Sequence, residues 1–268
     1  MNKTDRPISA SQINAWIECP GAWLLTYRYG YRSDGNEVMA RGLRVEQEVL
    51  ASVQRWQNRG ETLDVWPGDE TEIRMKRAVY DALREISRHD AFVWPEGNDQ
   101  HRIYYRQEST PVIGYLDALT RNRIVEIKTT SRDPGDTLPP SWARQLAIYY
   151  GAWEAVPVAM RPHLTVVVGL TRKANPCLIY STDYALMDEW MRIDGQEIAI
   201  VRPTSKFDII DTHAQEVRAA MDAIVSLQRV ETPDIVLPID FSHYRMRGFS
   251  AEVLADLRAG TLEENSDD

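Results

Sequence analysis

Two neighbouring strand patterns that carry charged residues constrain this chain more than any other feature. The first is V-I-G-Y-L-D-A-L-T (residues 112–120), and the second, after the polar break R-N-R, is I-V-E-I-K-T-T (residues 124–130). Both are rich in β-branched residues and bounded by polar turn material, which is typical of strands. Because side chains alternate along a strand, Glu126 and Lys128 share one face. A short antiparallel hairpin then brings Asp117 beside Glu126, at a sheet edge otherwise built from Val, Ile and Leu.

Charged side chains at such a position need a partner, since carboxylates and ammonium groups are rarely buried unless they pair or hold a metal ion. One interpretation is a cross-strand ion pair on a solvated sheet face. The other is a metal site for phosphodiester cleavage, in which Asp117, Glu126 and the backbone carbonyl of Ile127 supply the oxygen ligands that Mg²⁺ prefers. Lys128 then orients an attacking water or stabilises the transition state. The pattern alone leaves both interpretations open.

A second acidic candidate lies on an expected helix over residues 37–56. Its apolar positions recur at helical spacing. The neighbours of Glu46 one turn away in either direction lack charge: Gly42, Leu43, Val49 and Leu50. A carboxylate in that setting is either a further metal ligand or a helix-boundary side chain that reaches to water. Glu48, by contrast, lies one turn after Arg44 and is expected to be its solvated partner.

Further candidates flank the two strand patterns. In a helix expected over residues 141–155, Gln145 and Tyr149 are four residues apart and share one face. Gln145 can bind a base, a phosphate or the surroundings of the lysine, Tyr149 is either a substrate contact or core filler, and Arg144 is a candidate phosphate contact. Glu108 either points at the same metal or occupies a sheet edge. Gly114 either permits a close approach or marks a bulge.

The rest of the chain alternates between helical and strand patterns. Helices are expected over residues 9–29 with a Ser cap, and over 70–89, 184–201, 211–230 and 249–259. Strands are expected over residues 101–109, 163–170 and 178–182. We therefore expect one continuous α/β (α+β) domain over residues 1–203. Residues 204–268 form a helical extension packed on it, with a disordered acidic tail.

Composition excludes several function classes. The two cysteines cannot form a disulfide framework or a four-thiolate cluster, and the five histidines show no zinc-site spacing. There is no phosphate-binding P-loop and no G-x-S-x-G elbow. No run of 18 apolar residues and no secretory signal is visible, so a cytoplasmic, reducing setting is expected. The net charge of −9 argues only mildly against nucleic-acid binding, because a local basic groove remains possible.

Taken in order, these motifs resemble the PD-(D/E)XK nuclease superfamily, and within it the RecB-like and CRISPR-associated exonuclease branch common in phages. The matching segments run from residue 9 to about residue 150: S-A-S-Q-I-N-A-W-I-E-C-P (9–20), G-L-R-V-E (42–46), Glu108 before G-Y-L-D (114–117), E-I-K (126–128) and Q-L-A-I-Y (145–149). The resemblance implies a restriction-endonuclease-like core, a central mixed sheet flanked by helices. It also implies that Asp117, Glu126 and the Ile127 carbonyl bind Mg²⁺ or Mn²⁺, that Lys128 is the catalytic lysine, and that Gln145 and Tyr149 position the site and DNA.

The activity that the resemblance implies is a DNA exonuclease of phage or bacterial replication, recombination or repair. Its partners would be DNA with free ends and a single-strand annealing or recombination protein. A site-specific or structure-specific endonuclease, and a weakly active DNA-binding or regulatory protein on the same scaffold, are the alternatives. Two departures from the family matter. Many relatives have histidine where Glu46 stands, and only Cys19 remains of an iron–sulfur ligand set, so no cluster is expected and Cys19 should be a small buried side chain.

Overall fold

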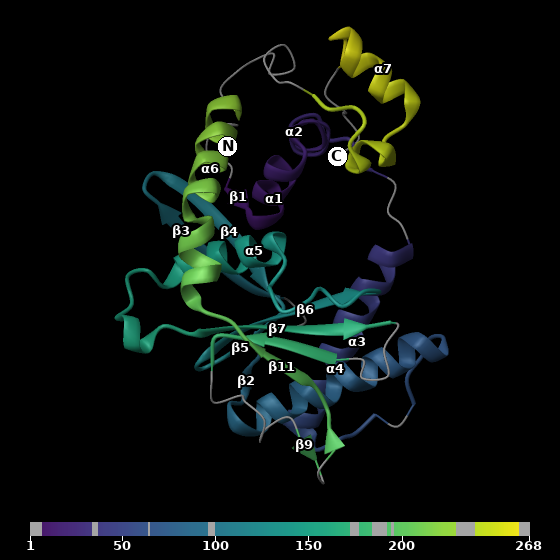
Figure 1. Cartoon of the computed structure of the whole chain (residues 1–268), viewed down its shortest axis with the longest axis vertical. Coiled ribbons are helices and arrows are strands. Elements are labelled where there is room, and N and C mark those ends of the chain that lie inside the picture. Colours follow the sequence, from purple (N-terminus) through teal and green to yellow (C-terminus); the bar gives the residue numbers. More distant parts are fainter. Residues whose placement is uncertain are drawn as a thin grey trace.

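The computed structural model describes residues 7–33, 37–63, 65–95, 100–171, 177–183, 192–193, 196–228 and 239–262. Its centre is a six-stranded sheet in the order β11–β8–β7–β6–β5–β2 (Figure 1). The strands are β2 (Phe92–Val93), β5 (Ala118–Thr120), β6 (Arg123–Thr130), β7 (His163–Leu170), β8 (Cys177–Ser181) and β11 (Ile200–Pro203). Two strand pairs are parallel (β6–β7 and β8–β11) and the other three are antiparallel, so the sheet is mixed. Helices flank it, and the expected α/β architecture is confirmed.

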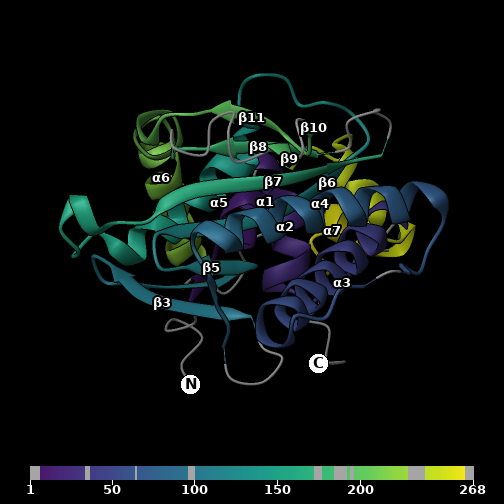
Figure 2. The same cartoon turned by 90° about the horizontal axis from the view of Figure 1, so that it is seen from below.

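Two long helices, α3 (Glu37–Arg59) and α4 (Glu70–His89), cover one face of the main sheet (Figures 1 and 2). Their apolar positions pack against Val125 and Ile127, the side chains of β6 that point to this side. Asp69 caps α4 by accepting a hydrogen bond from the backbone N–H of Glu72 at 2.8 Å, which fixes the start of the helix. The amphipathic pattern of residues 70–89 predicted this helix with the observed bounds.

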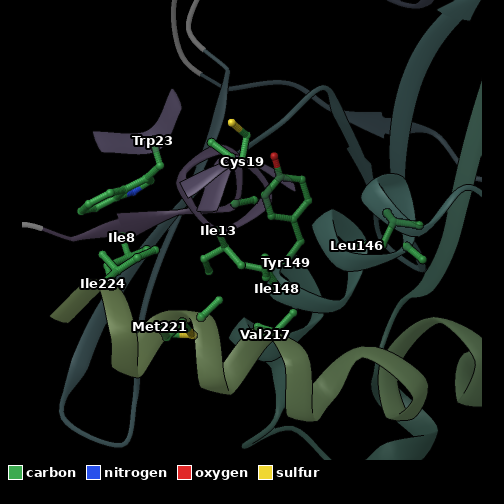
Figure 3. Close-up of a cluster of buried hydrophobic side chains, with 14 of the residues drawn as sticks. Ile8, Ile13, Cys19, Trp23, Leu146, Ile148, Tyr149, Val217, Met221 and Ile224 are labelled. Carbon is green, nitrogen blue, oxygen red and sulfur yellow. The ribbon is translucent and has the colours of Figure 1, made fainter. Parts of the chain in front are cut away.

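The other face is covered by α1 (Ala10–Glu18), α5 (Pro140–Tyr150) and α6 (Thr212–Gln228), with α2 (Pro20–Trp23) and a π-helix (Leu24–Arg28) beyond them. Ser9 caps α1 through Gln12, as predicted. Helix α1 ends at Cys19, and the Cys19 side chain is buried, both as predicted. Figure 3 shows Val217, Met221 and Ile224 of α6 pointing toward α1 and α5. The layer is thus held together by apolar packing of helices distant in sequence.

A smaller sheet of three strands lies beside the main one, in the order β1 (Ile8–Ser9), β4 (Thr110–Leu116) and β3 (His101–Gln107). This corrects the prediction of one continuous strand over residues 112–120. The chain leaves the small sheet after Leu116 and enters the main sheet at Ala118, so Asp117 lies at the junction. Gly114 is not a bulge, because it pairs in regular register with Ile103.

The C-terminal region packs on the same core as the rest. After a π-helix (Phe207–Asp211) and α6 come a 3₁₀-helix (Tyr244–Gly248) and α7 (Ala251–Ala259). Met246, Phe249 and Leu257 join the cluster formed by α1, α5 and the main sheet. The expected acidic tail, residues 263–268, lies outside the described residues.

Three smaller points complete the fold. Most of the helix expected over residues 184–201 lies outside the described residues. For the described part of this range the prediction is wrong, because it forms strands β9 (Arg192–Ile193), β10 (Gln196–Glu197) and the start of β11. Short 3₁₀-helices follow α5 at Gly151–Trp153 and Val158–Met160. Among the described helices, none has both the length and the apolar character needed to cross a membrane.

Candidate functional site

Asp117 and Glu126 are brought together at the junction of the two sheets, as the hairpin pattern predicts. The ladder between β5 and β6 pairs Ala118 with Val125, which sets Asp117 opposite Glu126. The backbone N–H of Ile127 donates to Oδ2 of Asp117 at 2.7 Å, and the N–H of Asp117 approaches Oε1 of Glu126 at 3.5 Å. The prediction that these residues lie at a sheet edge is wrong in one respect, because β6 is an internal strand between β5 and β7. On its β5 side, β6 lacks a paired strand only after Val125, the partner of Ala118.

This end of the ladder determines where the Ile127 carbonyl points. In a strand, the N–H and C=O of one residue face the same neighbour. Because the Ile127 N–H faces Asp117, its carbonyl faces the same side, beyond the last pair of the β5–β6 ladder. The carbonyl therefore lies on the Asp117 side of β6, where the sequence places a third oxygen ligand.

Lys128 contacts the carboxylate next to it on the same face of β6. Its Nζ lies 2.8 Å from Oε2 of Glu126. The Glu126 side chain is 1 % exposed and the Lys128 side chain 21 % exposed. An ion pair is thus present, but it differs from the cross-strand pair that we considered: both partners belong to β6, and the carboxylate end is buried and not on a solvated sheet face.

Glu46 reaches the same group of charges from α3. It accepts a hydrogen bond from Nε2 of Gln100 at 3.0 Å. Burial, and then repulsion by Asp117, raises the pKa of Glu46 to about 7, although Lys128 and Gln100 oppose the shift. The helical phase that singled out Glu46 therefore identified a carboxyl group that interacts electrostatically with Asp117.

The whole group carries more negative charge than its single lysine balances. Burial, and then repulsion by Asp117, raises the pKa of Glu126 to about 8. Burial also raises the pKa of Asp117, against the opposing effects of Lys128 and the Ile127 N–H. Burial favours neutral Lys128, yet the charges of Glu126 and Asp117 outweigh it and raise the pKa of this ammonium. Three carboxyl groups and one ammonium leave a deficit of two positive charges when all are ionised.

A divalent cation fits this deficit and these donors. Carboxylate and carbonyl oxygens are the ligands of Mg²⁺ and Mn²⁺, and Glu46, Asp117, Glu126 and Ile127 offer them. As the side chains lie, however, no three acidic, His or Cys side chains within the described ranges form a group that could hold a metal ion. Lys128 occupies one oxygen of Glu126 and the Ile127 N–H one of Asp117. A cation held by all of these oxygens would require the side chains to move closer together.

Gln145 and Tyr149 border the carboxylates from α5. Nε2 of Gln145 donates to the Tyr149 hydroxyl at 2.7 Å. Burial, and then the negative charge of Glu126, raises the pKa of Tyr149, which places its hydroxyl near the site. The ring also fills the core, since a Cβ on Gly114 would lie 2.7 Å from its Cε1. Gly114 is thus needed for a close approach, and the group that approaches is Tyr149.

Arg144, predicted as a phosphate contact, is engaged elsewhere. Its buried guanidinium donates to Asn14 at 2.8 Å and contacts Glu18 and Glu216. Glu18 in turn accepts from Nε of Arg245, 227 residues away, at 2.8 Å. Arg144 therefore joins α1, α5, α6 and the C-terminal region, and the structure favours a structural role.

Two other acidic residues are also placed differently from expectation. Glu108 is exposed at the turn between β3 and β4, with φ of 54°, at the opposite end of β4 from Asp117. Glu48 is not the partner of Arg44, which binds Glu37 and Glu72 instead. Glu48 lies 2.6 Å from Nζ of Lys76, a side chain of α4 that is fully buried.

A cavity of about 510 Å³ opens beside Glu46 and Asp117. Its wall includes Trp94 and Gln100, which sequence reasoning did not identify. Trp94 stands just after β2 and Gln100 just before β3, and no periodic pattern links either of them to α3. No protein-family model matches this chain, and no match is found among curated proteins.

Proposed function

We propose that this protein is a divalent-metal-dependent deoxyribonuclease that hydrolyses phosphodiester bonds at DNA ends. The observation that carries the proposal is the convergence of Glu46, Asp117 and Glu126 on one lysine, with burial that raises the pKa of all three carboxyl groups. A buried group with two negative charges in excess is suited to a divalent cation. The resemblance of the E-I-K and Q-L-A-I-Y segments to the RecB-like branch supports the nuclease chemistry.

Each residue has a role that follows from its position. Glu46, Asp117, Glu126 and the Ile127 carbonyl would hold Mg²⁺ or Mn²⁺, which when bound would neutralise charge on the scissile phosphate. Lys128, released from Glu126, would meet the phosphate or the attacking water with its ammonium. Gln145 restrains the Tyr149 hydroxyl beside the carboxylates and orients that side of the site.

The biological setting belongs to the same proposal. DNA with free ends is the substrate, within phage or bacterial replication, recombination or repair in the cytoplasm. A single-strand annealing or recombination protein is the protein partner that the family resemblance suggests. No iron–sulfur cluster is part of the proposal, because Cys19 and Cys177 are the only cysteines of the chain.

The test is digestion of end-labelled linear DNA and of closed circular DNA with Mg²⁺, with Mn²⁺ and with EDTA. We expect metal-dependent release of the label from linear DNA, its loss in Lys128→Ala and Glu126→Gln, and little change in Glu108→Gln. The last variant is the matched control, since it makes the same change at an exposed hairpin turn. Cleavage of circular DNA would favour the endonuclease alternative.

Retained cleavage in Lys128→Ala would overturn the assignment of the catalytic lysine. Absence of cleavage by the wild type under all conditions, with intact DNA binding, would favour the regulatory alternative.

A further inference from the structure

The cavity of about 510 Å³ is continuous with the carboxylate site, because Glu46 and Asp117 form part of its wall. Its size lies within the range of small-ligand pockets, about 300–1,000 Å³. One wall is a face of α3, where residues recur at helical spacing. Besides the two carboxylates, the side chains that line it include Leu43, Gln47, Leu50, Gln54, Trp94 and Gln100.

The chemistry of this lining suits a nucleobase better than a phosphate. Among the described residues of the wall, none is Lys or Arg, so no fixed positive charge awaits a phosphate. Leu43, Leu50 and Trp94 offer an apolar surface, and an indole ring is a stacking platform for any base. Gln47 and Gln54 provide amide groups, which can both donate to and accept from the edge of a base. Repulsion by Glu46 and Asp117 also disfavours an anion in the metal-free cavity.

The two residues before Trp94 are held by hydrogen bonds from both sides. The Gln57 side chain donates to the carbonyl of Phe92 at 2.7 Å and accepts from its N–H at 3.0 Å. Nε2 of His101 faces the carbonyl of Val93 within hydrogen-bond distance and so carries the proton. The Phe92 and Trp94 rings pack with centroids 5.5 Å apart. The segment that presents Trp94 is therefore fixed to α3 and β3 before any ligand arrives.

We propose that this cavity receives the base of an unpaired nucleotide at a DNA end, stacked on Trp94, while the adjoining phosphate lies at the carboxylate site. The proposal rests on the nuclease function proposed above and names its substrate class. A base enters such a cavity only after leaving its partner strand, which costs least in single-stranded DNA. The protein should therefore prefer single-stranded or frayed ends to blunt duplex ends.

The test uses a short single-stranded oligonucleotide that ends in 2-aminopurine, whose fluorescence falls on stacking, and the same end in a blunt duplex. Binding is measured with Mg²⁺ in a Lys128→Ala background, which is expected not to cleave, because without metal the charges of Glu46 and Asp117 would repel the adjoining phosphate. We expect quenching with the single strand, weaker binding of the duplex, and about tenfold or greater loss of affinity in Trp94→Ala, a typical effect of removing one stacked base contact. Trp153→Ala, a half-buried tryptophan elsewhere, is the matched control and should bind normally.

Unchanged affinity and quenching in Trp94→Ala, or equal binding of the blunt duplex by the protein with Trp94 intact, both in the Lys128→Ala background, would overturn the inference. Should Trp94→Ala fail to fold, Gln54→Ala on the same wall decides, with weakened binding supporting the inference and unchanged binding overturning it. The nuclease proposal is judged separately by metal-dependent release of the label. Quenching without hydrolysis would support base binding in the cavity and overturn the nuclease proposal. Hydrolysis without quenching would support the nuclease proposal and overturn base binding in the cavity.

Discussion

Two lysines, Lys128 and Lys76, are each surrounded by carboxylates, and their settings differ in one respect. Lys76 contacts Glu48 at 2.6 Å and Glu72 at 2.7 Å, and donates to the carbonyl of Pro67 at 2.7 Å. Arg44 adds a second cation at Glu72, at 3.3 Å. In the Lys128 site, by contrast, three carboxyl groups face a single cation. The group around Lys76 has its own counter-charges, and the group around Lys128 does not.

The pKa values record this difference. Burial raises the pKa of Glu72, but hydrogen bonds from Lys76 and Arg44 outweigh it, so the net effect is a lowered pKa. At Glu126, burial and the charge of Asp117 win, and the pKa rises to about 8. The cluster around Lys76, whose carboxylates already have cations, serves to fix α3 against α4. The cluster around Lys128, which lacks positive charge, is a candidate for binding a cation from outside.

The largest expected difference comes from replacing each lysine by methionine. Lys76→Met removes a fully buried cation from Glu48 and Glu72 and a donor from the Pro67 carbonyl. It should lower the free energy of unfolding by about 4 kcal/mol, typical of a broken buried pair. Lys128→Met should cost less than half as much, because the raised pKa of Glu126 lets it bind a proton instead. Urea unfolding at pH 7 without metal measures both. Equal losses would remove the distinction between the two groups.

The second prediction is a pH dependence of the metal-free protein. Since the pKa of Glu126 rises from 4.5 to about 8 on folding, the native state holds a proton that the unfolded state releases. Stability from this group is therefore present below pH 4.5 and is lost as the pH rises through 8. Unfolding between pH 5 and 9 should show the decline in wild type and a flatter profile in Glu126→Gln. A carboxyl with a lowered pKa, such as Glu72, predicts the opposite sign.

Addition of Mg²⁺ should reverse this loss. A cation that binds only the native state at a hundred times its dissociation constant stabilises by about 2.7 kcal/mol. Heat unfolding at pH 8 should show that Mg²⁺ raises the unfolding midpoint of the wild type. The midpoint of Glu46→Gln and of Glu126→Gln should not change with Mg²⁺. Glu72→Gln is the matched control, because its carboxylate already has cations, and it should keep the full shift. A lost shift in that variant would mean that the cation binds elsewhere.

The smallest effect is expected at Gly114, which has no counterpart around Lys76. A Cβ there would lie 2.7 Å from Tyr149 and 2.8 Å from Ile103, so Gly114→Ala should cost about 2 kcal/mol through overpacking. Displacement of Tyr149 should also slow hydrolysis. In an Ile103→Ala background the added cost should be smaller, and strict additivity in urea unfolding would contradict the packing argument.

The sequence predicted what depends on local periodicity. Residues 70–89 and 163–170 were placed with their observed bounds, because their apolar patterns are continuous and their neighbours break the period. The strand predicted over residues 112–120 divides at Asp117, since one strand pattern can serve two sheets in turn. Phase along α3 set Glu46 apart, but it could not show that Lys76 of another helix would cover Glu48. The positions of Arg144 and Trp94 likewise depend on segments far away in the sequence.

The contact between Glu18 and Arg245 has a consequence for the order of events in the cell. Because 227 residues separate the two, this contact forms only after residue 245 has been synthesised. Until then Glu18, which contacts Arg144 of α5, lacks its second cation. The helix that borders the carboxylates therefore gains this support only once Arg245 has been added to the growing chain.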